Sequence, residues 1–234
     1  MTGINDGLHR LHGLLQQLRD VNEQLERGPR QVKAREQLQA KAEEQLQAKR
    51  DALKQARANT DRKSLELKSN EAKLADLQAK LNAASSNREY DIIRGHMEAD
   101  TVAKSVLEDE ILDALEAVDR MQIEVAGAEK RAADARREKE RCAQQVSLAE
   151  GGLRAQAEQL SSQVREAEKV LSGDTAIQYR RLVEAYGADA LAAVDGRICT
   201  NCYTAITPQN RVALNSGQIK FCECGRLLYL ASGE

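Results

Sequence analysis

Apolar residues recur every seven positions through the first third of the chain. Nine of the eleven positions in this series are apolar, and Gln39 and Thr60 are the exceptions. The series is Leu11, Leu18, Leu25, Val32, Gln39, Leu46, Leu53, Thr60, Leu67, Leu74 and Leu81. A repeat of this length exceeds what a single globular helix shows and is typical of a left-handed coiled coil. The companion position, taken four residues on through Asn22, Glu36 and Glu43, is mostly polar. Ala42, Ala56 and Leu77, which lie beside it, are expected to widen the apolar stripe.

A second apolar repeat follows a short polar break. Ser85, Ser86 or Asn87 can cap a new helix, and Glu89 has the spacing of a capping box. From Ile93 to Val170 the predicted seam has 23 positions, of which 18 are apolar and many are alanine. Two arms of similar length predict an antiparallel hairpin over residues 1–172, roughly 110–120 Å long, with its tip near 85–89. A monomer is favoured, and an intermolecular dimer is the alternative.

Two pairs of helix-breaking residues interrupt the arms. Gly28-Pro29 predicts that one helix ends near Arg27, or that it kinks there. Gly151-Gly152 predicts a break in the return arm. In a hairpin with its tip near residue 87, Gly28 faces residue 146, so the two interruptions lie at a similar level. The sequence therefore predicts a shared bend near 28–29 and 151–152, with two independent, tolerated imperfections as the alternative.

Composition supports long helices and limits the functional classes. Charged residues make up 31% of the chain and aromatic residues 3%, with no tryptophan, so bulky side chains for a globular core are scarce. The net charge is only −2, which argues against a protein that binds polyanions through bulk charge. No signal sequence or membrane-spanning stretch is recognisable, so we expect a cytoplasmic protein. In a reducing compartment, paired cysteines are more often metal ligands than disulfides.

Four of the five cysteines lie near the carboxyl end in two close pairs. The candidate ligands are Cys199, Cys202, Cys222 and Cys224. Two cysteine pairs separated by a short β-prone insert are the pattern of a zinc site with four thiolates. Such a site has no open coordination position, so we expect one structural Zn²⁺ and no hydrolytic chemistry. A redox-active dithiol is the rival interpretation.

The segment that carries these cysteines is too small to fold by burial alone. Residues 173–234 are predicted as a second domain: a neck helix over 175–186, then a zinc ribbon. We expect an extended segment over 190–198, a helix over 209–215, and strands over 218–221 and 226–230. A module of this size has few large apolar groups, and zinc binding supplies free energy of folding. The predicted fold class is therefore mainly α, a long coiled-coil hairpin with a small β-rich zinc ribbon.

The other metal-binding residue types are interpreted as structural. His9 and His12 share a helix face, but no third ligand is near in sequence, which favours a solvated pair. Cys142 falls on the predicted seam, which favours a small buried residue with a free thiol.

The chain resembles the bacterial C4-type zinc-ribbon proteins that have a long N-terminal coiled-coil hairpin. The matching segments are Asn87-Arg-Glu-Tyr90, the first cysteine pair, Ile206-Thr-Pro-Gln209 and Cys224-Gly-Arg-Leu-Leu-Tyr229. The family's second knuckle is usually Cys-x-x-Cys-Gly-Arg, whereas Cys222 and Cys224 enclose a single residue. This departure puts in doubt whether both thiols bind. Some members are linked to flagellar gene expression through an alternative sigma factor and a flagellin messenger RNA. Others are linked to type III secretion components.

These observations favour a non-enzymatic adaptor that binds protein partners. By resemblance, the partner is a sigma factor or a secretion or flagellar component. The alternative is a regulator that binds RNA or DNA through the ribbon. Residues 187–234 carry four basic and four acidic side chains, which is a poor match to phosphate. No phosphate-binding loop or nucleophile with a base is present, so no enzymatic activity is predicted.

Overall fold

The computed structural model describes residues 3–231 and divides the chain into two compact units. The hairpin unit is Ala34–Arg141, and the ribbon unit is the chain up to Lys33 together with the chain from Cys142. Two long helices, α1 (Gly3–Asn82) and α2 (Asn87–Ala167), account for most of the residues, so the predicted mainly α fold is confirmed. Among residues 3–231, no helix combines the length and the apolar character needed to span a bilayer.

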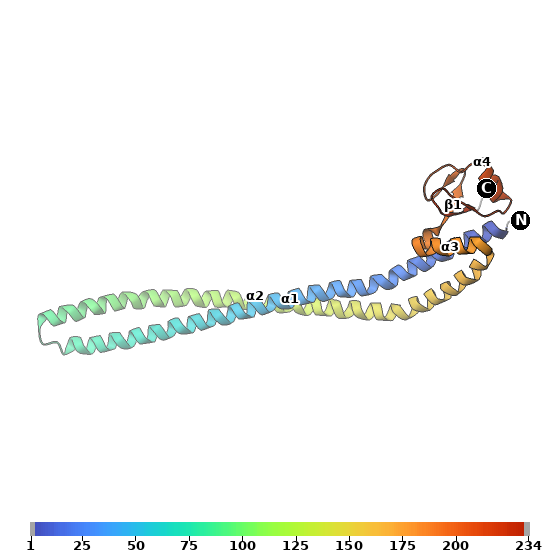
Figure 1. Ribbon diagram of the computed structural model, residues 1–234. Coiled ribbons are helices and arrows are strands. Elements are labelled where there is room, and N and C mark those ends of the chain that lie inside the picture. The colour runs from blue at the N-terminus through green and yellow to red at the C-terminus, as the bar shows by residue number, and fades with distance from the viewer. Residues whose placement is uncertain (1–2, 232–234) are drawn as a thin grey trace. The chain divides into compact units, whose positions relative to one another are not determined.

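Within the hairpin unit, α1 and α2 run antiparallel on either side of residues 83–86 (Figure 1). Leu53, Val118 and Val125 form its buried core, with Leu46, Ala56 and Met121 packed against them. Every position of the predicted seven-residue series in α1 is buried or half-buried, which confirms that seam.

The companion position of the α1 seam was predicted wrongly. Asn22, Glu36 and Glu43 are exposed, whereas Val21 is buried and Ala42 half-buried. The companion line therefore lies three residues after each seam position, not four. Ala42, Ala56 and Leu77, the residues expected to widen the apolar stripe, all lie on this line and are half-buried.

Ion pairs connect the two helices beside the seam. They are Lys49–Glu124 at 2.5 Å, Arg50–Glu129 at 2.7 Å, Lys63–Glu110 at 2.6 Å, Lys73–Asp100 at 2.8 Å, Lys104–Glu71 at 3.1 Å and Lys139–Glu36 at 4.0 Å. Each exposed pair contributes less than about 1 kcal/mol, but pairs of this kind favour one register over others. In four of these six, α1 supplies the base and α2 the acid.

The tip of the hairpin is capped by neighbouring side chains. Ser86 Oγ accepts a hydrogen bond from the backbone N–H of Glu89 at 3.3 Å, as a helix N-cap does. The Glu89 carboxylate accepts from the backbone N–H of Ser85 at 3.2 Å, one residue earlier than in the usual capping box. The tip predicted near 85–89 is at the observed chain reversal.

Neither Gly28-Pro29 nor Gly151-Gly152 ends a helix. Pro29 lies inside α1, and α2 continues through Gly151 and Gly152, so the predicted helix end near Arg27 and the break in the return arm are wrong. Gly28 does face Val146 as expected: a Cβ at Gly28 would lie 2.8 Å from Val146 Cγ1. The bend at this level stays a prediction.

The seam of α2 shifts by one residue in this region. Ala149 and Gln156, both predicted on the seam, are exposed, whereas Glu150 and Ala157 are half-buried. The seam thus takes two successive steps of four residues around Val146, a stutter that locally unwinds a coiled coil. A pocket of about 250 Å³ lies beside the stutter and is lined by residues that include Leu25, Pro29, Cys142 and Leu153.

Within the ribbon unit, the ends of α1 and α2 share one core with the sheet. Leu8, Leu11 and Leu15 of α1 are buried together with Tyr179 of α3 (Gly173–Tyr186) and with Tyr229. The predicted boundary at 172 would cut through this core. The ribbon unit therefore includes the ends of both long helices, because their apolar faces need the sheet to bury them.

The ribbon sheet has the strand order β2-β1-β4-β3. Its strands are β1 (Leu191–Asp195), β2 (Ile198–Cys199), β3 (Lys220–Phe221) and β4 (Leu227–Leu230). β1 and β4 are parallel, and the outer pairs are antiparallel. The short helix α4 (Pro208–Asn215) is capped by Thr207, and the 3-10 turns η1 (Glu168–Val170) and η2 (Gly187–Ala190) flank α3. The helices and strands predicted here are present, and Ala205 adds an isolated bridge with Ile198.

Substituting alanine for Gly28 and for Gly151 is expected to change the free energy of unfolding in opposite directions. Gly28→Ala places a methyl group 2.8 Å from Val146 Cγ1, and overpacking of this kind costs about 1–3 kcal/mol. Gly151 has nothing within 4 Å of an added Cβ, so Gly151→Ala stabilises the helix by about 0.5–1 kcal/mol. Urea unfolding of both variants measures this, and equal shifts would contradict the packing at Gly28.

Candidate metal centre

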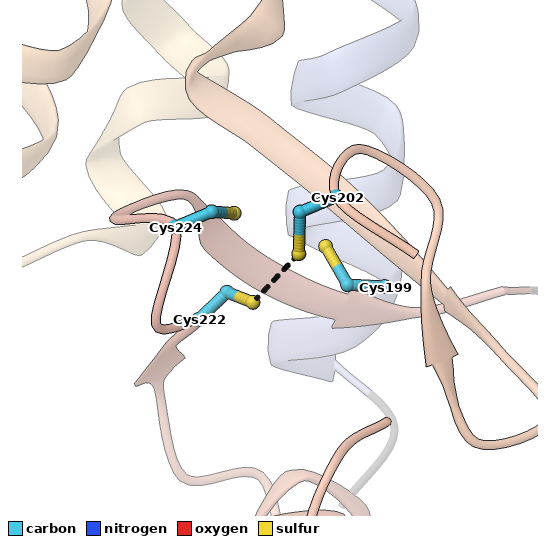
Figure 2. Close-up of side chains that lie close together, drawn as sticks. All are labelled: Cys199, Cys202, Cys222 and Cys224. Carbon is cyan, nitrogen blue, oxygen red and sulfur yellow. Dashed lines mark hydrogen bonds between the residues drawn. The ribbon is translucent and has the colours of Figure 1, made fainter. Parts of the chain in front are cut away.

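The four predicted cysteine ligands converge at one point. The sulfur atoms of Cys199, Cys202, Cys222 and Cys224 all lie within 4.8 Å of one another. Figure 2 shows the two pairs coming from two turns of the ribbon, with 3.6 Å between Cys202 Sγ and Cys222 Sγ. Four Zn–S bonds of about 2.3 Å in a tetrahedron put sulfur atoms about 3.8 Å apart. The cluster therefore has a size and a donor set that can hold a metal ion such as zinc.

The two knuckles have the same backbone hydrogen bonds although one is shorter. The N–H of Cys199 donates to Thr204 O at 3.1 Å, and that of Cys222 donates to Arg226 O at 2.8 Å. In each case the acceptor follows the second cysteine by two residues. The carbonyls of Cys199 and Cys222 accept from the N–H just after the second cysteine, at 2.9 and 2.8 Å. The missing residue is thus absorbed inside the turn, and both Cys222 and Cys224 reach the cluster.

In both knuckles the residue directly after the second cysteine has a left-handed backbone conformation. Gly225 takes this conformation with φ 83° in the second knuckle. In the first knuckle Tyr203 occupies it with φ 59°, and it is the one residue other than glycine with positive φ among residues 3–231. A side chain in this conformation costs about 1 kcal/mol or more. The knuckle geometry over-rides this local cost at Tyr203.

The surroundings shift the pKa values of three of the thiols, and not all in the same direction. Burial raises the pKa of Cys199 and raises that of Cys222 to about 12. Hydrogen bonds from Thr204 lower the pKa of Cys202 to about 6. Buried thiolates need a nearby positive charge, and a bound dication deprotonates its cysteine ligands outright. The mixture of buried and half-exposed thiols at one point is therefore suited to a cation.

The cluster is held by a small apolar core and by one arginine. Cys199 and Cys222 are buried with Val194, Leu214 and Leu228. The Arg226 guanidinium lies 3.5 Å from the ring centroid of Tyr186, and its Nη1 donates to Cys224 O at 3.2 Å. This contact connects the second knuckle to the end of α3. Sequence reasoning missed it, because nothing local pairs residues 40 positions apart.

The interpretation of His9 and His12 as a solvated pair is wrong for His12. His9 is exposed, but the His12 side chain is buried. Its Nδ1 lies 2.8 Å from Tyr229 Oη, and Gln16 Nε2 donates to its Nε2 at 3.0 Å. The network assigns the proton to Nδ1, which donates to Tyr229. His12 therefore connects α1 to β4 and is not a metal ligand. Cys142 is half-buried beside the pocket at the stutter.

Comparisons with known proteins show the fold and no more. No family model and no curated protein matches the chain. The structure is similar to CT398 from Chlamydia trachomatis, with a TM-score of 0.79 and 14% identity over 99% of this chain and 100% of that chain. It is also similar to the HP0958 protein from Helicobacter pylori, with a TM-score of 0.63 and 12% identity over 98% and 97%. A third similar structure, from Mycobacterium smegmatis, has a TM-score of 0.67 and 16% identity over 97% and 98%. At these identities the likeness shows a shared helical hairpin with a small sheet.

Stability is expected to fall at acid pH because of His12. Burial is the main cause that lowers its pKa from 6.5, opposed by Asp189 and reinforced by Arg19 and His9. The folded state then binds fewer protons than the unfolded state. This contribution is complete above pH 6.5 and is lost as the pH falls toward the lower folded pKa, by at most about 1.4 kcal/mol per pH unit.

The measurement is urea unfolding of the zinc-loaded chain between pH 7.5 and 5. We expect His12→Gln to flatten the pH dependence relative to the unsubstituted chain. His96→Gln is the matched control, since His96 is exposed in the hairpin unit and is not among the groups that shift the pKa of His12. An unchanged slope in His12→Gln would show that His12 does not titrate with folding.

Proposed function

We propose that the chain is a non-enzymatic adaptor in which four thiolates hold one structural Zn²⁺ and the protein surfaces bind partner proteins. The observation that carries the proposal is the convergence of four sulfurs within 4.8 Å. The donor set fits zinc: Cys₄ sites are structural, because they leave no coordination position for water or substrate. The ribbon has few large apolar side chains, so the ion supplies free energy of folding.

The adaptor role is supported by a large surface without a second reactive cluster. Among residues 3–231, the four cysteines are the one group of three or more His, Cys, Asp or Glu side chains close enough to share a metal. The accessible surface is 15755 Å², against roughly 10,500 Å² for a compact protein of this mass. A protein with so much surface and so little chemistry is suited to binding. A sigma factor or a secretion component remains the partner class that the family resemblance suggests.

Binding of RNA or DNA through the ribbon is less well supported. Four basic and four acidic residues over 187–234 leave no excess positive charge, and Zn²⁺ with four thiolates adds −2. Arg226 is engaged with Tyr186 and Cys224 O, and Lys220 is half-buried in β3. Phosphate binding depends on available Lys and Arg side chains. The ribbon therefore offers little to a polyanion.

The zinc proposal predicts one ion per chain. Cys222→Ser is expected to lower the zinc content well below one, because it removes a buried thiolate from the second knuckle. Cys142→Ser is the matched control and is expected to retain full zinc. Chelation should change the far-UV circular dichroism only slightly, since α1 and α2 contain 80 and 81 residues and have their own seam. Elemental analysis of the reduced protein measures the content, and negligible zinc in the unsubstituted chain would refute the site.

The adaptor proposal predicts that the immobilised intact chain retains proteins from a bacterial lysate after nuclease treatment. Direct binding of single-stranded RNA should be weak at physiological salt and unchanged by Lys220→Ala. Fluorescence anisotropy with labelled RNA measures the second part. Retention that nuclease abolishes, together with tight RNA binding that Lys220→Ala weakens, would replace the adaptor by the nucleic-acid regulator.

A further inference from the structure

One side of α2 in the hairpin unit carries an exposed stripe that the coiled coil does not use. Starting at Val102, steps of four, three, four and three residues lead through Val106, Asp109 and Asp113 to Glu116. The next two steps pass through Arg120, which pairs with Glu116, and reach Ile123. This spacing keeps the residues on one face of a helix. We call these six residues, Val102, Val106, Asp109, Asp113, Glu116 and Ile123, the outward stripe.

The apolar members of the outward stripe are fully available to a partner. Val102 is 65% exposed, Val106 51% and Ile123 75%, and Leu112 beside them is 61% exposed. The outer positions of a coiled coil are usually polar, because nothing in the coil covers them. On α1, the facing segment 51–72 exposes one large apolar residue, Leu65 at 66%. The apolar surface is therefore concentrated on one arm, as expected for a binding face.

The charge around the outward stripe is strongly one-sided. Residues 102–123 contain six acidic and two basic side chains, a net charge of −4, whereas residues 51–72 carry +1. Glu110 is paired with Lys63 of α1, and Glu116 with Arg120 at 3.7 Å. Among residues 3–231, no ion pair involves Asp109 or Asp113. Two free carboxylates thus lie between apolar side chains on the same face.

We propose that the outward stripe is a docking surface for a basic amphipathic helix of a protein partner, an inference that rests on the adaptor function. A helix with apolar residues on one face and Lys or Arg among them matches both the exposed Val and Ile side chains and the free carboxylates. A nucleic acid is disfavoured here by the negative charge. A second copy of this chain fits less well, since segment 51–72 of α1 offers only Leu65 opposite four exposed apolar residues.

The test uses the intact zinc-loaded chain and synthetic helical peptides of leucine and lysine. One peptide has all its leucines on one face, a second has the same composition in scrambled order, and a third has glutamate in place of lysine. Fluorescence anisotropy is expected to show saturable, salt-sensitive binding of the first peptide. We expect binding at least about tenfold weaker for the scrambled and acidic peptides. Equal binding of the scrambled peptide would overturn the proposal.

Variants locate the surface. Val106→Gln with Leu112→Gln is expected to weaken binding about tenfold by removing the apolar contact. Asp109→Asn with Asp113→Asn is expected to weaken it several-fold and to reduce its salt dependence. Leu65→Gln on α1 is the matched control and should have no effect. Because all these side chains are exposed, melting temperatures should be unchanged. A Leu65→Gln effect equal to that of the first pair would refute the assignment.

The remaining outcomes separate this inference from the adaptor proposal. If the Val106→Gln/Leu112→Gln chain retains the same lysate proteins as the unsubstituted chain, the adaptor role stands and the outward stripe is the wrong surface. If neither retains any, the adaptor role itself fails. Sedimentation velocity covers the last case: a dimer of the unsubstituted chain that Val106→Gln/Leu112→Gln dissolves would assign the stripe to a second copy.

Discussion

The sheet of the ribbon is buried on both faces, and the rest of the ribbon unit depends on this arrangement. Side chains alternate along a strand, so each strand serves two cores. On β4, Leu227 and Tyr229 pack against the base of the hairpin, whereas Leu228 packs with the cysteines. Leu191 and Ala192 divide in the same way on β1. A sheet of such short strands cannot bury both faces by itself. It needs the helices on one side and the core around the cysteine cluster on the other.

Because of this two-sided burial, the two faces of the ribbon sheet have different structural roles. The face toward α1 carries the His12–Tyr229 hydrogen bond at 2.8 Å, which fixes the strand against the first helix. The opposite face carries the knuckles, where backbone hydrogen bonds and the proposed ion fix the turns. Removing either support leaves one face of β4 uncovered. The cysteine cluster is therefore a structural part of a larger core and not a separate appendage, as expected for a structural metal site.

The repeat and the cysteine pairs were predictable because each is a local pattern. Seven-residue steps identify Leu53 and Leu67 without knowledge of the partner helix, and Cys199-x-x-Cys202 indicates a knuckle by spacing alone. The companion seam was only partly predictable: steps of four residues select the exposed Glu43, whereas the half-buried Ala42 carries the apolar signal one residue earlier. At the stutter, hydrophobicity favours Ala149 over Glu150, yet Glu150 is the half-buried one, because the seam takes two successive steps of four residues there. The contact of His12 with Tyr229 spans 217 residues and leaves no local signal.

The electrostatics that set the register of the hairpin also explain its acidic outer face. Lysines and arginines of α1, such as Lys49 and Lys63, pair with acids at the edges of the α2 seam. Those pairs neutralise the charges of Glu124 and Glu110, but the side chains of α1 do not contact the opposite side of α2. Acids on the far side of α2, such as Asp109, therefore form no such pair within the part of the chain that the structure describes, and they lie near the exposed Val106. At physiological ionic strength the Debye length is about 8 Å, so such a face attracts a basic partner only at short range. Apolar contact must then supply most of the affinity, and charge selects the partner.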